Sequence, residues 1–436
     1  MIPATAPIFR LTASRLRSLQ ALGVMCGLAA GAWLGAAEAP TKLVRAGVSP
    51  VVISLLMVVG VFLARWSVPA LVRGTTQVYA DARQAPHLIL WAILAGCLWA
   101  VANTLTIFAI RDIGLSIAFP LWNVNSLLGI FWGFIFFNEL RQAGWRRWLG
   151  VLGGALLMFA GAVLLALASS TQASNVRALH GVAAALAAGV LWGTMYIPYR
   201  KAYLTGMNPL SFVAFFTIGE LGMMTALAVG SAGGALPLWR ELVEARSILF
   251  WLAAGGFIWV IGDLLQQYAA KYIGISRGIP LSNTNQLWGL LWGMLVFGEL
   301  RGHAAPLYVQ VIGGSLIMAA GAAAIAFSST SPKEHEHWQA AALRESERYG
   351  TDLDYVRAGL EGRNAGYGGA GETTVRRTAL DWTMLAITTL VFVALASMAR
   401  TPEVPFNGLA ATILFAVILV ILAICGAMLW RTTRFS

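Results

Sequence analysis

Charged residues are scarce in this chain. Asp, Glu, Lys and Arg make up 11% of its 436 residues and hydrophobic residues 58%, whereas a soluble domain carries about 25% charged residues. The formal charge of +11 could suggest nucleic acid. However, the basic residues lie mostly at the ends of apolar runs, where they would anchor at anionic headgroups. We therefore expect a membrane protein without a nucleic-acid partner.

Cysteine and histidine are also scarce. The three cysteines, Cys26, Cys97 and Cys425, fall within apolar runs, so no disulfide framework or metal spacing is indicated. The five histidines are scattered, and no phosphate-binding motif accompanies them. We expect no metal, no cofactor and no catalytic residue. A polytopic membrane enzyme stays open as an alternative, although clustered catalytic groups do not support it.

Long apolar runs, in contrast, are abundant. A helix of about 20 apolar residues can cross a bilayer because it bonds its own backbone groups. We identify twelve candidate spans, at residues 18–38, 49–68, 87–109, 113–137, 147–169, 179–202, 208–231, 248–269, 274–297, 307–327, 379–399 and 408–430. They predict an all-α polytopic protein of a cell (inner) membrane.

The fourth and ninth spans contain nearly the same sequence. Residues 120–141 read PLWNVNSLLGIFWGFIFFNELR, and residues 280–301 read PLSNTNQLWGLLWGMLVFGELR. Other spans match at a similar shift, so each copy holds five spans, at 18–169 and 179–327. Because five is odd, the second copy must cross the membrane in the opposite direction. The sequence predicts a ten-helix inverted 5+5 repeat followed by a two-helix hairpin at 379–430.

The charge distribution predicts the orientation of the chain. Twelve basic residues of the ten-span core fall on the side of the N-terminus and seven on the other side. This bias places residues 1–17 in the cytoplasm. Residues 328–378 are rich in both charge signs and end in a glycine-rich run. We expect a solvated cytoplasmic loop there, with one helix within 334–360 and a flexible linker.

A proline followed by two asparagines occurs in each copy. Pro120 and Pro280 should bend or break their spans. Asparagines at a spacing of two point to opposite sides of a helix. One of each pair could bond a neighbouring span while the other, Asn123 or Asn283, faces a cavity. Alternatively, all four asparagines only join helices or satisfy the carbonyl that proline leaves free.

The same two spans end in a glutamate. Glycines at a spacing of four predict that the fourth and ninth spans pack closely. Glu139 and Glu299 follow at the C-terminal ends, where the helix dipole disfavours a carboxylate. Arg141, Arg301 or another basic loop residue could compensate them. We interpret these glutamates as a structural latch or as part of a gate.

The third and eighth spans carry a polar stripe at helical spacing. A ring and hydrogen-bonding groups on one face suit a ligand with apolar faces and polar edges, such as a sugar. The stripe consists of Trp99, Asn103 and Thr106 in the third span and of Trp259, Asp263 and Gln266 in the eighth.

Two carboxylates lie within spans. An ionised Asp263 near the centre of its span costs at least ~2.5–3.5 kcal/mol. Substrate binding or ion coupling would explain it, and so would an ion pair with Lys271 or Arg277. Glu220 in the seventh span aligns with Val61 and is therefore specific to one copy. It could share proton coupling with Asp263 or face water in a loop.

Residues 193–201 read GTMYIPYRK. They could form a bent helix whose aromatic and basic residues anchor at the interface. The segment also resembles the G-x-x-x-x-P-x-K-K stretch of the glucose/ribose uptake family and the rhamnose-proton symporters, within the drug/metabolite transporter superfamily. Residues 96–103 (GCLWAVAN) and 113–116 (IGLS) are similar to other segments of this group. The matching first-copy stretch departs by carrying Glu38, and the hairpin has no counterpart there.

The resemblance covers residues 18–327 and implies a central cavity lined by spans one to four and six to nine. We expect a secondary transporter of a small neutral polyhydroxylated solute, with a sugar preferred, that works by alternating access and is coupled to protons or another ion. The alternative cargo is amino acids, nucleotide-sugars or other metabolites, carried outward. The expected site contains Trp99, Asn103, Asn123, Trp259, Asp263, Gln266 and Asn283.

Overall fold

The computed structural model describes residues 12–37, 49–113, 118, 121–141, 143–169, 175–298, 305–328, 330–363, 377–400 and 406–436. All regular elements within these ranges are helices, which confirms the prediction of an all-α protein. Ten of them are long and apolar enough to cross a membrane. They are α1 (Ala13–Ala36), α3 (Pro50–Val72), α5 (His87–Ile113), α8 (Trp145–Ser169), α9 (Asn175–Leu204), α10 (Pro209–Ser231), α12 (Leu249–Ile273), α15 (Ala305–Phe327), α18 (Ala379–Met398) and α19 (Gly408–Thr433).

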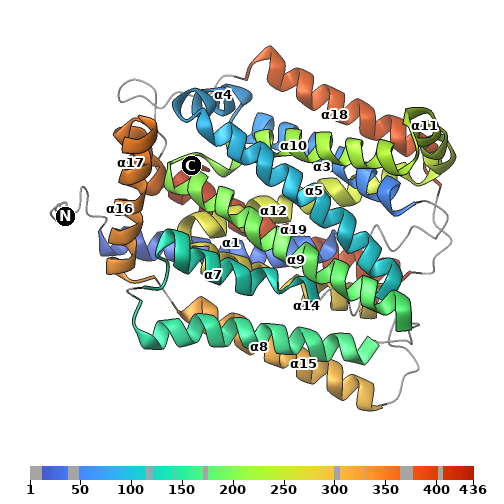
Figure 1. Ribbon diagram of the computed structural model, residues 1–436, viewed down its shortest axis with the longest axis horizontal. Helices are drawn as coiled ribbons and strands as arrows, with labels where there is room; N and C mark the ends of the chain where they lie inside the picture. Colours follow the sequence, from blue (N-terminus) through green and yellow to red (C-terminus); the bar gives the residue numbers. More distant parts are fainter. Residues whose placement is uncertain are drawn as a thin grey trace.

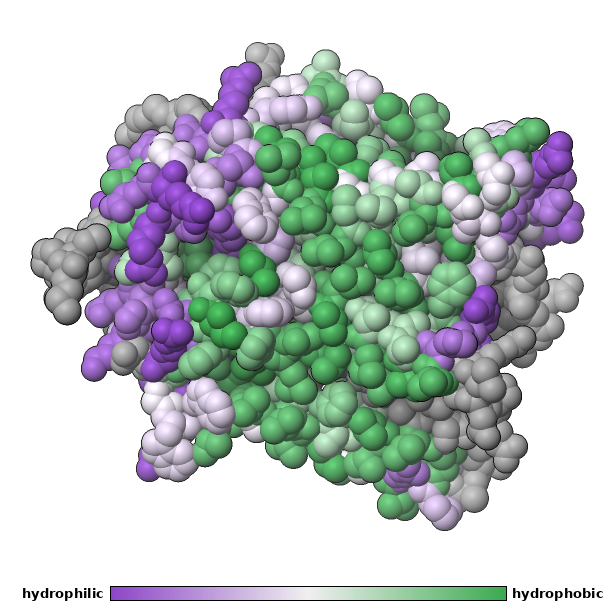
Figure 2. Space-filling model, viewed as in Figure 1, coloured by the Kyte–Doolittle hydropathy of each residue, from purple (hydrophilic) through white to green (hydrophobic). Residues whose placement is uncertain are grey.

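The surface of the bundle is apolar between two hydrophilic ends. The long helices run roughly along the horizontal axis of Figure 1. Figure 2 shows a broad apolar zone between hydrophilic left and right edges. Large apolar side chains lie exposed on the outer helices. On α18, for example, the Leu390 side chain is 67% exposed. Such a belt has a stable environment in lipid, so the chain is an integral multi-pass membrane protein.

The two remaining predicted spans are broken helices. In the ninth, α13 (Ile275–Ser282) is followed after a turn by α14 (Asn285–Leu291) and a π-helix (Trp292–Val296). In the fourth predicted span, α7 (Asn125–Phe137) begins at Asn125, the position equivalent to Asn285 at the start of α14. Pro280 lies inside α13, so the break comes at Asn283, just after the proline rather than at it. Pro120 and Glu299 lie outside the described residues.

The sequence duplication reappears as paired helix crossings. The helix α3 crosses α12, and α10 crosses α5 in the same way. At each crossing, a Cβ built on a glycine would lie 2.0 Å from a carbonyl oxygen of the partner helix, so the backbones touch. The glycines and the residues whose carbonyls they approach are Gly60 and Ala253, Gly256 and Met57, Gly219 and Ile93, and Gly96 and Phe216.

The fifth spans of the two copies pack against each other at the edge of the bundle. The helices α8 and α15 lie along the lower edge of Figure 1. The added hairpin contacts the bundle on other sides, where α18 packs on α3 and α19 packs on α1. Two short helices, α4 (Thr75–Gln84) and α11 (Ala235–Glu244), follow spans at the two ends.

Residues 332–360 differ from the solvated loop that their charge suggests. They form α16 (Pro332–Tyr349) and α17 (Leu353–Leu360), which lie across the end of the bundle where α1 begins (Figure 1). Glu334 is 0% exposed and Trp338 is 2% exposed. A helix within 334–360 was expected, but one of its faces is buried because Arg277 of the bundle pairs with Glu334, while most of its other charged residues are exposed. We call residues 332–360 the end cap.

Candidate functional site

Three ionisable side chains meet in the interior of the bundle. Arg65 on α3 donates from Nη1 to Oε2 of Glu220 on α10 and from Nη2 to Oδ2 of Asp263 on α12, each at 2.7 Å. All three side chains are at most 1% exposed. Gln267, one turn beyond Asp263, donates to the same Oδ2 at 2.8 Å. The two intramembrane carboxylates therefore share one guanidinium, and we call the three residues the ion triad.

The structure corrects the partners expected for these carboxylates. Arg65, rather than Lys271 or Arg277, pairs with Asp263, and Arg277 binds Glu334 at 2.8 Å. Glu220 is 0% exposed, so it does not face loop water. Arg65 is a binding partner that the sequence pattern did not single out. The available signal was its position inside an apolar span. In the structure, α3 continues beyond Arg65 to Val72, so the arginine lies within the helix rather than at its end.

The ion triad breaks the symmetry of the repeat. At the shift of 159 that aligns Gly60 with Gly219, Arg65 corresponds to Met224 and Glu220 corresponds to Val61. The third member, Asp263, corresponds to Asn103 at a shift of 160. One α3–α10–α12 junction is thus charged, while the pseudo-equivalent junction is neutral.

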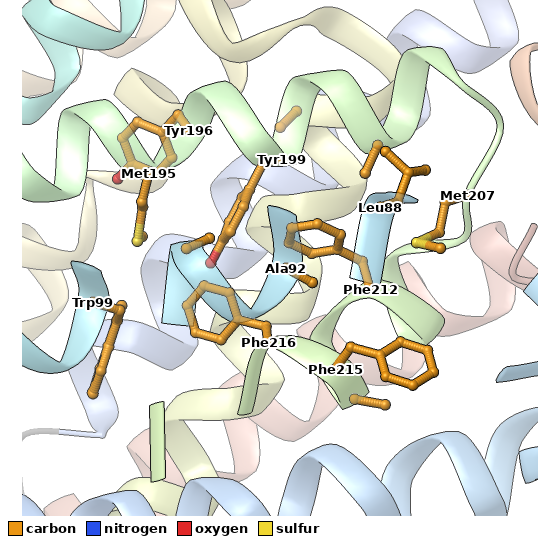
Figure 3. Close-up of a cluster of buried hydrophobic side chains, with 14 of the residues drawn as sticks. Leu88, Ala92, Trp99, Met195, Tyr196, Tyr199, Met207, Phe212, Phe215 and Phe216 are labelled. Carbon is orange, nitrogen blue, oxygen red and sulfur yellow. The ribbon is translucent and has the colours of Figure 1, made fainter. Parts of the chain in front are cut away.

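The two predicted tryptophans lie side by side at the interface of the repeats. The ring centroids of Trp99 and Trp259 are 5.2 Å apart. The guanidinium carbon of Arg65 lies 5.5 Å from the centroid of Trp259 and 4.2 Å from that of Phe216. Figure 3 shows Trp99, Phe216 and Tyr199 in the same buried cluster. The rings therefore directly adjoin the ion triad.

The other polar residues of the predicted stripe bond neighbouring helices. Asn103 donates to Ser54 Oγ on α3 at 2.5 Å. Gln266 donates to Ser282 Oγ on α13 at 2.5 Å. Thr106 donates to the carbonyl of Asn103 in its own helix at 2.7 Å. Each amide is thus engaged by a serine of a neighbouring helix.

Asn283, which sequence placed at a cavity, instead bonds the other broken helix. Asn283 donates to Ser126 Oγ and to Asn125 Oδ1, which joins the two breaks across the repeats. Asn125 in turn donates to the Tyr196 hydroxyl at 3.4 Å. Asn123 is 7% exposed, and its Nδ2 has no hydrogen-bond partner among the described residues. Asn123 thus keeps a buried amide without a partner in the described part of the chain, whereas Asn283 holds the helices together.

Glu139 pairs with Arg200 on α9 rather than with Arg141, and Arg301 lies outside the described residues. Glu139 lies 2.7 Å from Arg200 Nε and accepts hydrogen bonds from the backbone of Ile275 and Ser276. The carboxylate at the end of α7 thus caps the start of α13, where the dipole favours it. Arg200 is 1% exposed, so it is not an interfacial anchor.

The central residues are closed to solvent. Trp99, Asn103 and Asp263 are 3%, 8% and 1% exposed. A cavity of about 390 Å³ opens elsewhere, between α1, α15 and α19. Its mainly apolar lining contrasts with the polar centre, so we assign the site to the chemistry around the ion triad rather than to this cavity.

The comparisons with known proteins reveal distant relatives. No protein-family model matches the chain. A "Putative sugar uptake protein" of Listeria innocua is 24% identical over 235 residues, covering 53% of this chain and 76% of that protein. A "Putative ribose uptake protein" of Enterococcus faecalis is 26% identical over 242 residues, covering 53% and 77%. One solved structure aligns with a TM-score of 0.43 and 18% identity over 68% of this chain and 95% of that one.

Proposed function

We propose that this chain is a secondary transporter of a small neutral polyhydroxylated solute, a sugar, that works by alternating access. The observation that carries the proposal is the Trp99–Trp259 pair beside a buried ion triad, at the junction of two inverted repeats. The names of the distant relatives, which refer to sugar and ribose uptake, support the same cargo.

The central groups match the chemistry of a sugar. Aromatic rings pack against the apolar faces of a pyranose or furanose, and amides and carboxylates bond its hydroxyls. Asp263 Oδ1, Asn123 Nδ2 and the Tyr199 hydroxyl are buried without a hydrogen-bond partner among the described residues. They can accept from or donate to a solute that enters with its own hydroxyls. An anionic cargo would instead meet the surplus negative charge of two carboxylates against one guanidinium.

That charge surplus also favours proton coupling. With both carboxylates ionised, the ion triad carries a net charge of −1 in the interior of the bundle. An uncompensated charge near the centre of a membrane costs at least ~2.5–3.5 kcal/mol. Binding of one proton by Asp263 or Glu220 removes that cost. The protonated form would therefore be favoured as the site closes, and the proton would enter and leave only while water reaches the site.

The repeats are joined at one end by a contact that must break during transport. Glu139 of the first repeat bonds Arg200 and the start of α13 in the second. We infer that this gate opens when the two halves rock apart. With the N-terminus in the cytoplasm, as the charge bias predicts, this gate faces the cytoplasm.

A ligand panel tests the cargo. Sugars, amino acids and nucleotides are added separately to purified protein, and the apparent melting temperature is measured, because a ligand stabilises the state that binds it. We expect pentoses or hexoses to raise the melting temperature. Stabilisation by amino acids or nucleotides alone would overturn the sugar assignment and favour the metabolite alternative.

A further inference from the structure

The end cap binds both repeats at once. Glu334 accepts from Arg277 on α13 in the second repeat, with N–O distances of 2.8 and 3.0 Å. The same carboxylate accepts from the backbone N–H of Leu140, which follows α7 in the first repeat, at 3.0 Å. One fully buried side chain therefore bridges the two halves, directly beside the Glu139 gate.

Further contacts join the end cap to one repeat or the other. On the second repeat, Trp338 lies under Arg200, with 4.1 Å between the guanidinium carbon and the ring centroid. On the first repeat, the Tyr349 and His87 rings stack at 3.8 Å. Farther along, the Tyr355 hydroxyl donates to Asp81 at 3.2 Å. The end cap is thus attached to both repeats along its whole length.

The fit of α17 is close enough to exclude side chains. A Cβ built on Gly359 would lie 2.4 Å from the Cα of Gly206, in the turn between α9 and α10. Gly206 has φ +95°, a conformation that glycine adopts at little cost. The backbones of the end cap and of the second repeat therefore meet directly, which is unlike a loop that lies loosely on a surface.

We propose that the end cap is an autoinhibitory lock, which holds the two repeats together and must release before the central site opens at this end. The inference rests on the alternating access proposed above. If α7 and α13 separate at this end, Glu334 cannot keep both the Leu140 N–H and Arg277. Opening therefore requires either that the end cap leaves the bundle or that it loses its contacts with one repeat.

Water access to the central site provides the test. Ser282 on α13 is 0% exposed and bonds Gln266, so a cysteine there reports on the site and not on the surface beneath the end cap. The variant S282C is made in full-length protein that lacks Cys26, Cys97 and Cys425. Its labelling rate is measured in liposomes with a membrane-impermeant maleimide.

Two loosening variants and one control are compared. E334Q removes the charge that bridges the repeats, and W338A removes the ring beneath Arg200. The control E345Q removes the partner of Lys201, a contact at 2.8 Å whose glutamate is 26% exposed. A partly exposed ion pair contributes less than a buried contact, because water screens its charges, whereas losing a buried partner is costly. We therefore expect labelling to rise about tenfold or more in the first two and to stay within about twofold in the control.

Unchanged labelling in E334Q and W338A, with native helix content and elution volume, would overturn the lock. If E334Q does not fold because Arg277 is left buried and unpaired, W338A decides alone, since Arg200 keeps Glu139. The readout needs no sugar. Faster labelling of the variants, in a protein that binds no sugar, would overturn the proposed cargo and keep the lock. Sugar binding with unchanged labelling would keep the cargo and overturn the lock.

Discussion

Nη2 of Arg65 on α3 lies 2.7 Å from Oδ2 of Asp263 on α12. The contact joins the first repeat to the second in the interior of the bundle, and both side chains are buried. A charge in such a position is tolerated only with a partner, because lipid and packed helices solvate it poorly. The bridge therefore both stabilises the fold and sets the charge that a solute or proton encounters.

The stability of the protein depends on the balance of charge within the ion triad rather than on each ion pair separately. R65M leaves two buried carboxylates without a cation, and we expect it to destabilise the protein by about 3–5 kcal/mol. The variant R65M/E220Q/D263N has no charge left and should recover most of that loss. The apparent melting temperature in detergent measures both. If the triple variant is no more stable than R65M, the pairing does not explain the buried charges.

The tryptophan pair should bind the solute through its rings. We expect W259A to reduce ligand-induced stabilisation strongly and W259F to retain much of it, because an aromatic contact is worth about 0.5–1.5 kcal/mol beyond its buried area. W122A is the matched control, since Trp122 packs against Trp192 in a separate cluster. A concentration series of the stabilising sugar gives the affinities. Equal affinities for wild type and W259A would remove Trp259 from the site.

The helix crossings predict opposite results for two neighbouring glycines. An added Cβ at Gly219 meets the carbonyl of Ile93 at 2.0 Å, while one at Gly222 meets nothing within 4 Å. G219A should therefore lose about 1–3 kcal/mol through overpacking. G222A on the same helix should be neutral or slightly stabilising, because alanine favours helix. Thermal unfolding measures the stability of both variants. Similar losses of stability in G219A and G222A would show that α10 and α5 do not cross as closely as the structure indicates.

The end cap should release in acid. Burial, together with the positive charge of Arg200, lowers the pKa of His335 to about 4 from its ordinary 6.5. The other charges around it are Lys271 on α12, Arg277 on α13 and its neighbour Glu334. Because the docked state holds this proton less tightly than a released one, docking is fully favoured above pH 6.5 and weakens as the pH falls towards 4.

Glu334 acts in the same direction. Burial opposes its ionisation, but Arg277 outweighs burial and holds the pKa of the carboxyl below its ordinary value. Its contribution is present above about pH 4.5 and is lost as the pH falls through the lowered pKa. The check is the ratio of S282C labelling rates in H335Q and wild type between pH 7 and pH 5, which cancels the pH dependence of the thiol. The wild-type rate should rise in acid relative to H335Q, and a constant ratio would contradict this role of His335.

Sequence predicted the features that follow from local pattern. Apolar runs located the helices, and the shift of 160 relates the helix starts at Asn125 and Asn285, which lie beyond the prolines where sequence placed the bends or breaks. It also grouped Trp99 with Trp259, whose rings lie side by side in the structure. These inferences succeeded because hydropathy and helical spacing act within a single segment, and symmetry then relates the two segments.

Partners from distant segments were not predictable in this way. Arg65 meets Glu220 and Asp263 only because α3, α10 and α12 converge, and nothing in its own span indicates that crossing. The end cap had weak signals, namely the Ser331–Glu334 capping box and Trp338 in an otherwise polar helix. Its mixed charge suggested solvent because Arg277, which pairs with Glu334, and Arg200, which covers Trp338, lie more than 50 residues earlier in the chain.

Uptake by purified protein in liposomes tests the transporter account most directly. Accumulation of labelled pentoses and hexoses is measured with and without a pH gradient, for wild type and D263N. The variant keeps the Arg65–Glu220 pair and should fold. We predict gradient-driven accumulation by wild type, and in D263N a loss of accumulation with sugar exchange retained. Absence of sugar accumulation by wild type under either condition would contradict the cargo, and unchanged pH coupling in D263N would contradict the role of Asp263.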